Sequence, residues 1–278
     1  MPHDTADAPE TTRGSASPGY LVPAVRNAVA IINYLNGAPS HAVTLAELST
    51  KLALTKSHCH SILRTLVQAG WVTFDERTKS YELSSGLISS ASSLLNSPVL
   101  DRIRERLAAL TSETGYSGML TQPQADGTFV VVDYFSSRRA VEFRYSVGFR
   151  FPADSPAQSR AFIAWQPAER IEAWLDSLHP HRYTPASKVD REQLAEEVRA
   201  TRQRGYSRSV AEHFDGMMAC AMPIYDSGGR MLYIFCIIGR VQDLQVQEEV
   251  VAVAMKRTVE DIHRAILARP PIQPVPQW

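Results

Sequence analysis

The sequence predicts an α+β protein of two domains, a winged helix-turn-helix followed by a mixed α/β domain. Two patterns support this prediction. Residues 44–83 have the pattern of a helix, a short turn, a helix and a two-stranded hairpin, and residues 116–268 alternate between strand-like and helix-like segments. A chain of 278 residues suits two domains, and its hydrophobic content of 44% is sufficient for their cores.

The helix-turn-helix is predicted from two amphipathic segments. The first helix follows an N-cap at Thr44, and a second helix begins after an N-cap at Thr55 and extends to about residue 69. Gly70 ends the second helix as the residue after its C-cap. The apolar stripe of the first helix is Leu45, Leu48 and Leu52, and that of the second is Cys59, Ile62, Leu63, Leu66 and Val67.

The other face of the second helix has small, polar or cationic side chains, the kind that contact base edges and phosphates in a major groove. A wing follows, with strands at 71–74 and 80–83 around a polar turn. The predicted DNA-contacting residues are Thr55, Lys56, Ser57, His58, His60, Ser61 and Arg64 of the helix and Arg77 and Lys79 of the wing. An ordinary solvated surface is the alternative, because helix-turn-helix pairs also occur in proteins that bind no nucleic acid.

The charge of this segment is small. Residues 21–84 contain six Lys or Arg and four Asp or Glu, a net charge of +2, and the whole chain has a net charge of zero. Because phosphate contacts dominate affinity for DNA, a single copy would bind weakly. We therefore expect a homodimer or homotetramer on double-stranded DNA.

The segments around the helix-turn-helix are assigned from composition and periodicity. Residues 1–20 are polar and are predicted to be disordered, and the winged helix-turn-helix spans residues 21–84. Its opening helix, at about 25–35, has Val25, Val29, Ile32 and Leu35 on one face. Residues 85–97 are predicted to be a single linker helix. Its small residues favour contact with a partner helix, and packing on its own domain is the alternative.

Residues 98–268 are predicted to form the second domain. Helices are predicted at 98–114, 156–165, 167–178, 189–204 and 246–267, and strands at 117–122, 128–135, 140–147, 219–224 and 231–238. The inward residues of the first helix are Leu100, Ile103, Leu107 and Leu110. Those of the last helix are Val246, Val250, Val251, Ala254, Ile262 and Ile266. The proline-rich residues 269–278 are predicted to be a flexible tail.

Several classes of function are excluded at this stage. Three cysteines give no disulfide framework and favour a reducing cytoplasm, and no apolar run is long enough to span a membrane. His58 with His60, and His179 with His181, lack the partners of a metal site, so we expect no metal and no cofactor. Glu212, His213 and Cys220 lack a further orienting group, so we expect no enzyme.

Five motifs in order resemble the IclR family of bacterial transcription regulators over about residues 21–268. In the first domain they are VPAVRNAVAII, SHCHSILRTLVQAGWV and KSYELSSGL. In the second domain they are VGFRFPADSPAQSRAFIAW and RGYSRSVAEHFDGMMACAMPIYDSGGRMLYIFCIIG. The resemblance implies a winged helix, a linker helix and a GAF-like effector domain, in a dimer or tetramer that binds an operator and responds to a small metabolite.

The resemblance also adds to the DNA-contacting residues and limits them. It places Arg26 of the opening helix among them. Family members often have Thr where this chain has His58 and Arg where it has Ser61, so operator contacts do not carry over residue by residue. Exposure and resemblance together favour Lys56, Ser57, His60 and Arg64.

The resemblance further implies a set of effector-binding positions. They are Phe143, Phe151, Ala157, Gln158, Ser209, Met217, Ala219, Cys236 and Ile238, and Tyr145 joins them because it shares a strand face with Phe143. Phe and Met with few hydroxyls favour a large apolar effector such as an aromatic acid, whose carboxylate would meet the helix N-terminus near residues 157–160. The same side chains would also suit a packed core. The alternative function is a small-molecule-binding or enzymatic domain whose winged helix makes protein contacts.

Overall fold

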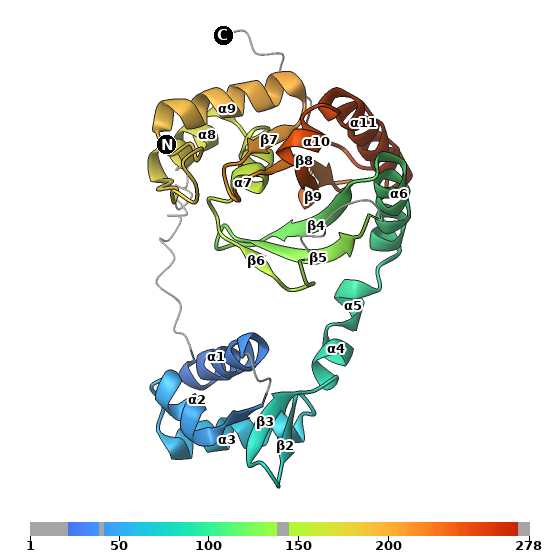
Figure 1. Ribbon diagram of the computed structural model, residues 1–278. Coiled ribbons are helices and arrows are strands. Elements are labelled where there is room, and N and C mark those ends of the chain that lie inside the picture. The colour runs from blue at the N-terminus through green and yellow to red at the C-terminus, as the bar shows by residue number, and fades with distance from the viewer. Residues whose placement is uncertain (1–21, 39–41, 138–144, 272–278) are drawn as a thin grey trace, which may run out of the picture. The chain divides into compact units, whose positions relative to one another are not determined.

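The computed structural model describes residues 22–38, 42–137 and 145–271. The predicted disordered segment 1–20, most of the predicted tail and Phe143 lie outside these ranges. The chain divides into two compact units, residues 1–94 and residues 95–278 (Figure 1). Both contain helices and strands, so the α+β prediction is confirmed.

The N-terminal unit is a winged helix-turn-helix. Its elements are α1 (Pro23–Gly37), β1 (Val43–Thr44), α2 (Leu45–Lys51), α3 (Lys56–Gln68), β2 (Val72–Asp75) and β3 (Ser80–Leu83), and the strands pair in the order β1-β3-β2. Both predicted N-caps are confirmed: Thr44 accepts a hydrogen bond from the N–H of Glu47, and Thr55 from that of His58. Gly70, with φ of 72°, follows the end of α3 as predicted.

The buried face of α1 differs from the predicted one. Ile31 and Leu35 are buried in the core of the unit, whereas Val25 is 61% exposed and Val29 is 51% exposed. This helix has two apolar stripes. The stripe that contains Ile31 and Leu35 faces α3, whereas the start of the predicted stripe, at Val25 and Val29, faces solvent. Val67 of α3 is also exposed, because it lies at the edge of a stripe whose other four residues already fill the core.

The predicted single linker helix is wrong. The segment forms two short helices, α4 (Gly86–Ser90) and α5 (Ser92–Leu95), separated at Ala91. The hydroxyls of Ser89 and Ser90 donate to backbone carbonyls four residues earlier. Such bonds compete with the helix ladder and help to explain why a serine-rich segment does not continue as one helix.

The C-terminal unit is built around a six-stranded antiparallel sheet with the strand order β6-β5-β4-β9-β8-β7. The strands are β4 (Ser117–Pro123), β5 (Phe129–Phe135), β6 (Arg150–Phe151), β7 (Ser207–Val210), β8 (Met217–Tyr225) and β9 (Met231–Arg240). The helices are α6 (Pro98–Thr114), α7 (Pro156–Ile163), α8 (Ala168–Ser177), α9 (Arg191–Arg204), α10 (Val241–Leu244) and α11 (Glu248–Ala265).

Helices pack on both faces of this sheet. Residues of α6 and α11 share a hydrophobic cluster with Cys220 and Ile237, whereas residues of α7 share one with Ala221 and Cys236. Because neighbouring residues of a strand point to opposite faces, α7 lies on the face opposite to α6 and α11. The predicted inward residues of α6 are all buried.

Three expectations for this unit need correction. Residues 145–147, the described end of a predicted strand, are not in a strand, and a short strand β6 forms at residues 150–151 instead. The last helix begins at Glu248, and Val246 and Val250 are exposed because its buried stripe follows Val251, Met255 and Ile262. Strand β7 was not predicted, since four residues carry too short a pattern. Among the described residues, no helix is long and apolar enough to cross a membrane.

Candidate functional site

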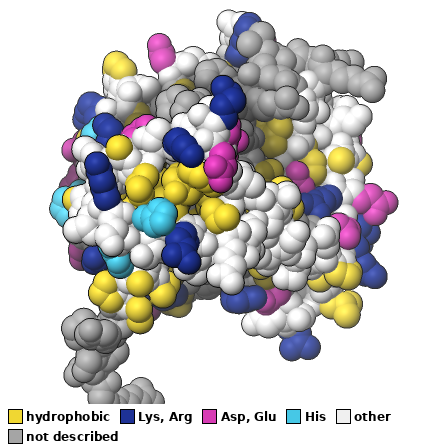
Figure 2. Space-filling view, turned by 90° about the horizontal axis from the view of Figure 1, so that it is seen from below, with side chains coloured by type: hydrophobic (Ala, Val, Ile, Leu, Met, Phe, Trp, Pro, Cys, Tyr) yellow, Lys and Arg dark blue, Asp and Glu magenta, His cyan; other side chains and the backbone are white. Residues whose placement is uncertain are grey.

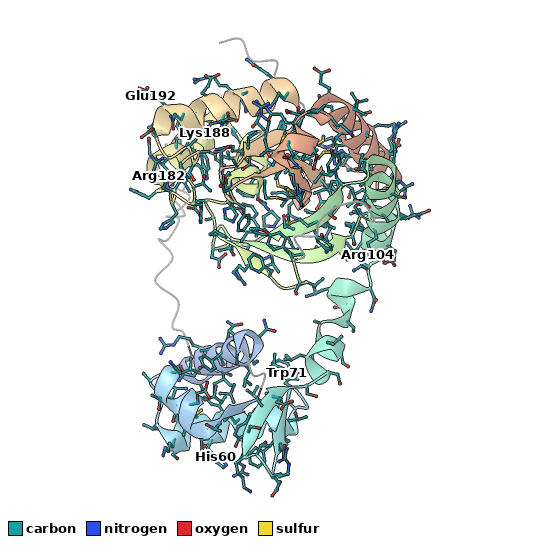
Figure 3. The ribbon with its side chains drawn as sticks, in the orientation of Figure 1. His60, Trp71, Arg104, Arg182, Lys188 and Glu192 are labelled. Atoms are coloured by element: carbon teal, nitrogen blue, oxygen red, sulfur yellow. The ribbon has the colours of Figure 1, made fainter. Side chains whose placement is uncertain are left out.

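The first candidate site is the exposed face of α3. All seven helix residues predicted to contact DNA are exposed, while Cys59, Ile62, Leu63 and Leu66 hold the helix in the core. Figure 3 labels His60 on this helix. The side chains of Lys56, Ser57, His60 and Arg64 have no hydrogen-bond or ion-pair partner within the described chain, so they are available to a ligand.

Other predicted contacts are partly engaged within the unit. The Nε2 atom of His58 lies 3.1 Å from the side-chain amide nitrogen of Asn27, and the hydroxyl of Ser61 donates to the carbonyl of Ser57 at 3.0 Å. Lys79 lies 3.7 Å from Glu76 in an exposed ion pair, while Arg77 and Arg26 are exposed. On the face drawn in Figure 2, basic side chains are scattered among acidic and apolar ones, in keeping with the zero net charge of the chain.

The second candidate site is a pocket between the sheet and α7 in the C-terminal unit, and we call it the effector pocket after the predicted effector positions in its lining. Its empty space is about 360 Å³, including its opening to solvent. The lining residues are Met119, Tyr145, Phe151, Ser155, Pro156, Ala157, Gln158, Ser209, His213, Phe214, Met217, Met218, Ala219, Cys236 and Ile238. Nine of them are predicted effector positions, and they come from β6 and the segment before it and from α7, β7, β8 and β9.

Strand register brings the sheet side of this pocket together. Ser209 pairs with Ala219 across β7 and β8, and Ala219 pairs with Ile238 across β8 and β9. Cys236 in turn pairs with Met119 of β4. Paired residues point to the same face of an antiparallel sheet, so these side chains form one wall, and the small Ala219 leaves the space at its centre.

Two polar atoms in the pocket wall have no partner. The hydroxyl of Tyr145 and Nδ1 of His213 are buried and have no hydrogen-bond partner within the described chain. Burial raises the pKa of Tyr145 and lowers the pKa of His213, so both side chains are uncharged at neutral pH. Buried polar groups are rarely left unpaired, so a bound molecule with complementary polar groups would satisfy them.

The N-terminus of α7 forms another part of the wall. The hydroxyl of Ser155 does not cap the helix but donates to the side-chain carbonyl of Gln158 at 2.8 Å. The backbone N–H groups of Ala157 and Gln158 therefore have no acceptor within the described chain. Two such amides at the positive end of a helix dipole suit a carboxylate.

A buried ion pair fixes α7 to the segment that carries His213. The guanidinium of Arg160 binds the carboxylate of Glu212 at two points, at 2.7 and 2.5 Å, and both residues are buried. Glu197 of α9 lies 4.0 Å from Arg160 and pairs with Lys188 and Arg204. Lys188 is labelled in Figure 3. Burial alone would raise the pKa of Glu197, but these three cations together lower it.

The sequence missed six lining residues and this ion pair. Met119 pairs with Cys236 across β4 and β9, so strand register would have found it. Ser155, Pro156 and Met218 are neighbours in the chain of predicted positions, whereas His213 and Phe214 lie between β7 and β8, where the sequence carries no signal for them. The partners of the Arg160–Glu212 pair are separated by 52 residues, and local periodicity carries no signal for such contacts.

The structure also bears on the residues considered for catalysis and for metal binding. Cys220 is buried and Glu212 is bound to Arg160, so neither is available as a nucleophile or base. No cluster of His, Cys, Asp and Glu suited to a metal occurs among the described residues.

Comparison with known proteins identifies the class of molecule with these two sites. The family model described as the IclR helix-turn-helix domain matches residues 24–76, and the model described as bacterial transcriptional regulator IclR C-terminal matches residues 91–264. These matches cover more than half of the chain. The chain belongs to the IclR family, and it is a DNA-binding transcription regulator rather than an enzyme.

Individual relatives have low sequence identity over most of the chain. The HTH-type transcriptional regulator XynR of Escherichia coli is 23% identical over 81% of this chain and 90% of its own length. The transcriptional repressor IclR of the same organism is 27% identical over 74% of this chain and 77% of its own. An IclR-type regulator structure from Alicyclobacillus acidocaldarius has a TM-score of 0.78 at 24% identity, and covers 88% of this chain and 99% of that one.

A further solved structure is an IclR homologue from Microbacterium hydrocarbonoxydans in complex with 4-hydroxybenzoate. It has a TM-score of 0.74 at 16% identity, and covers 88% of this chain and 99% of that one. At this identity the likeness concerns the fold.

Proposed function

We propose that this regulator binds operator DNA through α3 and the wing, and that an organic acid with an aromatic or apolar body, bound in the effector pocket, modulates that binding. In this assignment residues 21–84 are the DNA-binding domain, 85–97 the linker and 98–268 a GAF-like effector domain. The protein acts in the cytoplasm as a homodimer or homotetramer. The observation that carries the effector part is the pocket itself, an apolar space with unpaired polar groups.

The pocket walls support the choice of an aromatic acid. Phe151, Phe214 and Met217 offer flat or adaptable apolar surface, and the unpaired hydroxyl of Tyr145 and Nδ1 of His213 offer hydrogen bonds. The amides at the start of α7 would hold the carboxylate. A relative with the same fold has been crystallised with 4-hydroxybenzoate, which is a molecule of this class.

Calorimetric titration of the full chain with benzoate, 4-hydroxybenzoate, glyoxylate and pyruvate tests the effector class. The aromatic acids are expected to bind and to raise the melting temperature. Ala219→Leu fills the centre of the pocket and is expected to abolish their binding, whereas Ala173→Leu, on the exposed side of α8, leaves it unchanged. Tight binding of glyoxylate or pyruvate alone would reject an aromatic effector.

The DNA part of the proposal rests on the free side chains of α3. Arg64→Ala removes one cation from the exposed face without touching the core. Affinity for DNA from upstream of the protein's own coding sequence is expected to fall, and the slope of log affinity against log salt to decrease by about one unit. Arg240→Ala, an exposed arginine of the C-terminal unit, is the control. Unchanged affinity and slope in Arg64→Ala would favour protein contacts as the role of the winged helix.

The regulatory step follows from differential binding. An effector that binds one arrangement of the protein more tightly shifts the population towards that arrangement. If the two arrangements present α3 differently to DNA, effector and operator affect each other's affinity by the same factor. Effector titrations with and without DNA are expected to give different dissociation constants, and identical constants would argue against the coupling.

A further inference from the structure

A second cavity lies at the far end of β8, between the end of α9 and the C-terminal half of α11. Its empty space is about 950 Å³, including its opening to solvent. It is lined by residues 202–205 at the end of α9, by Lys256, Val259, Glu260 and His263 of α11, and by Trp165, Met222, Pro223, Tyr225, Pro270 and Pro271. None of these residues lines the effector pocket.

The cavity wall has more positive charge than its neighbours neutralise. Arg204 pairs with Glu197 at 3.3 Å. Arg202 donates to the backbone carbonyls of Ala164 and Gln166 and has no carboxylate partner within the described chain. Burial without such a partner lowers its pKa.

Lys256 also has no carboxylate partner within the part of the chain that the structure describes. Its ammonium lies 5.5 Å from the centre of the Tyr206 ring. Glu260 is the acidic lining residue, and it is exposed at the rim. A half-buried cation without a counter-charge is costly, so the wall favours a bound anion.

Hydrogen-bond donors in the wall also lack partners. Nε1 of Trp165, Nε of Arg204 and the hydroxyl of Tyr225 are buried and unpaired within the described chain. His263 accepts the backbone N–H of Tyr225 on Nε2 at 3.1 Å, so in the neutral ring the hydrogen is on Nδ1. Seven buried side-chain atoms in the described residues lack a partner, and five belong to residues that line one of the two cavities. Unpaired groups are therefore concentrated where a ligand would satisfy them.

The rest of the wall is apolar. Trp165, Met222, Pro223 and Val259 give it a surface against which a flat hydrocarbon body fits. We propose that this cavity is a second small-molecule site, which takes an organic anion with its apolar body against Trp165 and Pro223 and its acidic group towards Lys256 and Arg202. The site is separate from the effector pocket and does not depend on the proposed effector.

Fluorescence titration of the full-length protein with the anion 8-anilinonaphthalene-1-sulfonate tests this proposal, with the uncharged N-phenyl-1-naphthylamine as the matched probe. The wild-type protein is expected to bind the sulfonate saturably and more tightly than the amine. Lys256→Met keeps the aliphatic stem and removes the charge, so the sulfonate is expected to bind about fivefold more weakly. Lys51→Met, the same change at an exposed residue of the N-terminal unit, leaves binding unchanged.

A variant that is expected to bind the sulfonate more tightly distinguishes an effect of charge from a loss of binding through misfolding. Glu260→Gln removes the exposed negative charge at the rim and is expected to tighten sulfonate binding about twofold. Ala219→Leu, which fills the effector pocket, leaves this site intact. Equal binding by wild type, Lys256→Met and Glu260→Gln would overturn the proposal, and so would loss of sulfonate binding in Ala219→Leu. A variant truncated after Pro271 adds one more test. If the sulfonate binds to this variant and not to the full-length protein, residues 272–278 compete with it for the cavity, and the proposal is overturned.

Discussion

At the scale of single residues, Arg160 and Glu212 have an unusual position for charged side chains. They are 1% and 2% exposed, and the planar guanidinium matches the carboxylate with two hydrogen bonds. Transfer of both charges from water is costly, and their attraction offsets that cost only while both are present. The pair therefore makes the position of α7 relative to Glu212 and the neighbouring His213 sensitive to either residue.

Glu212→Gln tests this at one side chain. The change leaves the Arg160 charge buried without a carboxylate at hydrogen-bond distance, so the free energy of unfolding is expected to fall by about 3 kcal/mol in urea denaturation. Glu196→Gln is the matched control, because the Glu196–Arg199 pair is on the surface of α9 and is expected to contribute less than about 1 kcal/mol. Similar losses in both variants would show that burial does not set the cost.

At the scale of elements, the start of α4 packs directly on the turn between α3 and β2. A Cβ atom at Gly86 would lie 2.0 Å from the carbonyl oxygen of Gly70, so only glycine fits. The N–H of Ser84 donates to the carbonyl of Trp71 at 2.9 Å, and the indole N–H of Trp71 donates to the hydroxyl of Ser90 at 2.9 Å. These contacts connect α4 to the wing within the N-terminal unit.

Gly86→Ala is therefore expected to shift the backbone of α4 or of the turn. Overpacking of this kind costs about 1–3 kcal/mol, which thermal unfolding will register as a lower melting temperature. The matched control is Gly37→Ala at the end of α1, where a Cβ meets no atom of the described residues within 4 Å and the change is expected to be neutral or slightly stabilising. If Gly86→Ala is as stable as Gly37→Ala, the backbone of the turn moves to accommodate the methyl group at little cost in free energy.

Sequence patterns predicted elements well where a single apolar stripe determines the buried side. The helices α3 and α6 were predicted with nearly correct ends, because the N-cap Thr55 and the proline Pro98 in the first turn mark their starts. Patterns failed where two stripes compete, as in α1, since only the partner element decides between them. Sequence patterns also did not predict contacts between segments that are distant in the chain. The bond between Arg160 and Glu212 arises when α7 packs against the segment after β7, which depends on the complete sheet.

At the scale of the whole molecule, equal numbers of acidic and basic residues leave the eight histidines to dominate the charge change between pH 7 and pH 5. Two of them are held neutral by burial. Burial lowers the pKa of His213 in the effector pocket, and it lowers the pKa of His263 in the second cavity to about 4. In the folded protein these two side chains therefore take up a proton only at a lower pH than an exposed histidine does.

The last prediction concerns His263 and the stability of the whole chain. Its pKa is about 6.5 when the chain is unfolded and about 4 in the folded protein. Between these values the unfolded chain takes up a proton that the folded chain does not, so the free energy of unfolding falls as the pH is lowered from about 6.5 to about 4. His263→Gln removes this titration and keeps a side-chain oxygen that can accept the N–H of Tyr225. Urea unfolding at pH 7, 6 and 5 is therefore expected to show a smaller loss of stability in His263→Gln than in wild type. The exposed variant His179→Gln serves as the control and is expected to follow the wild type. Parallel pH profiles for wild type and His263→Gln would mean that His263 titrates normally in the folded protein.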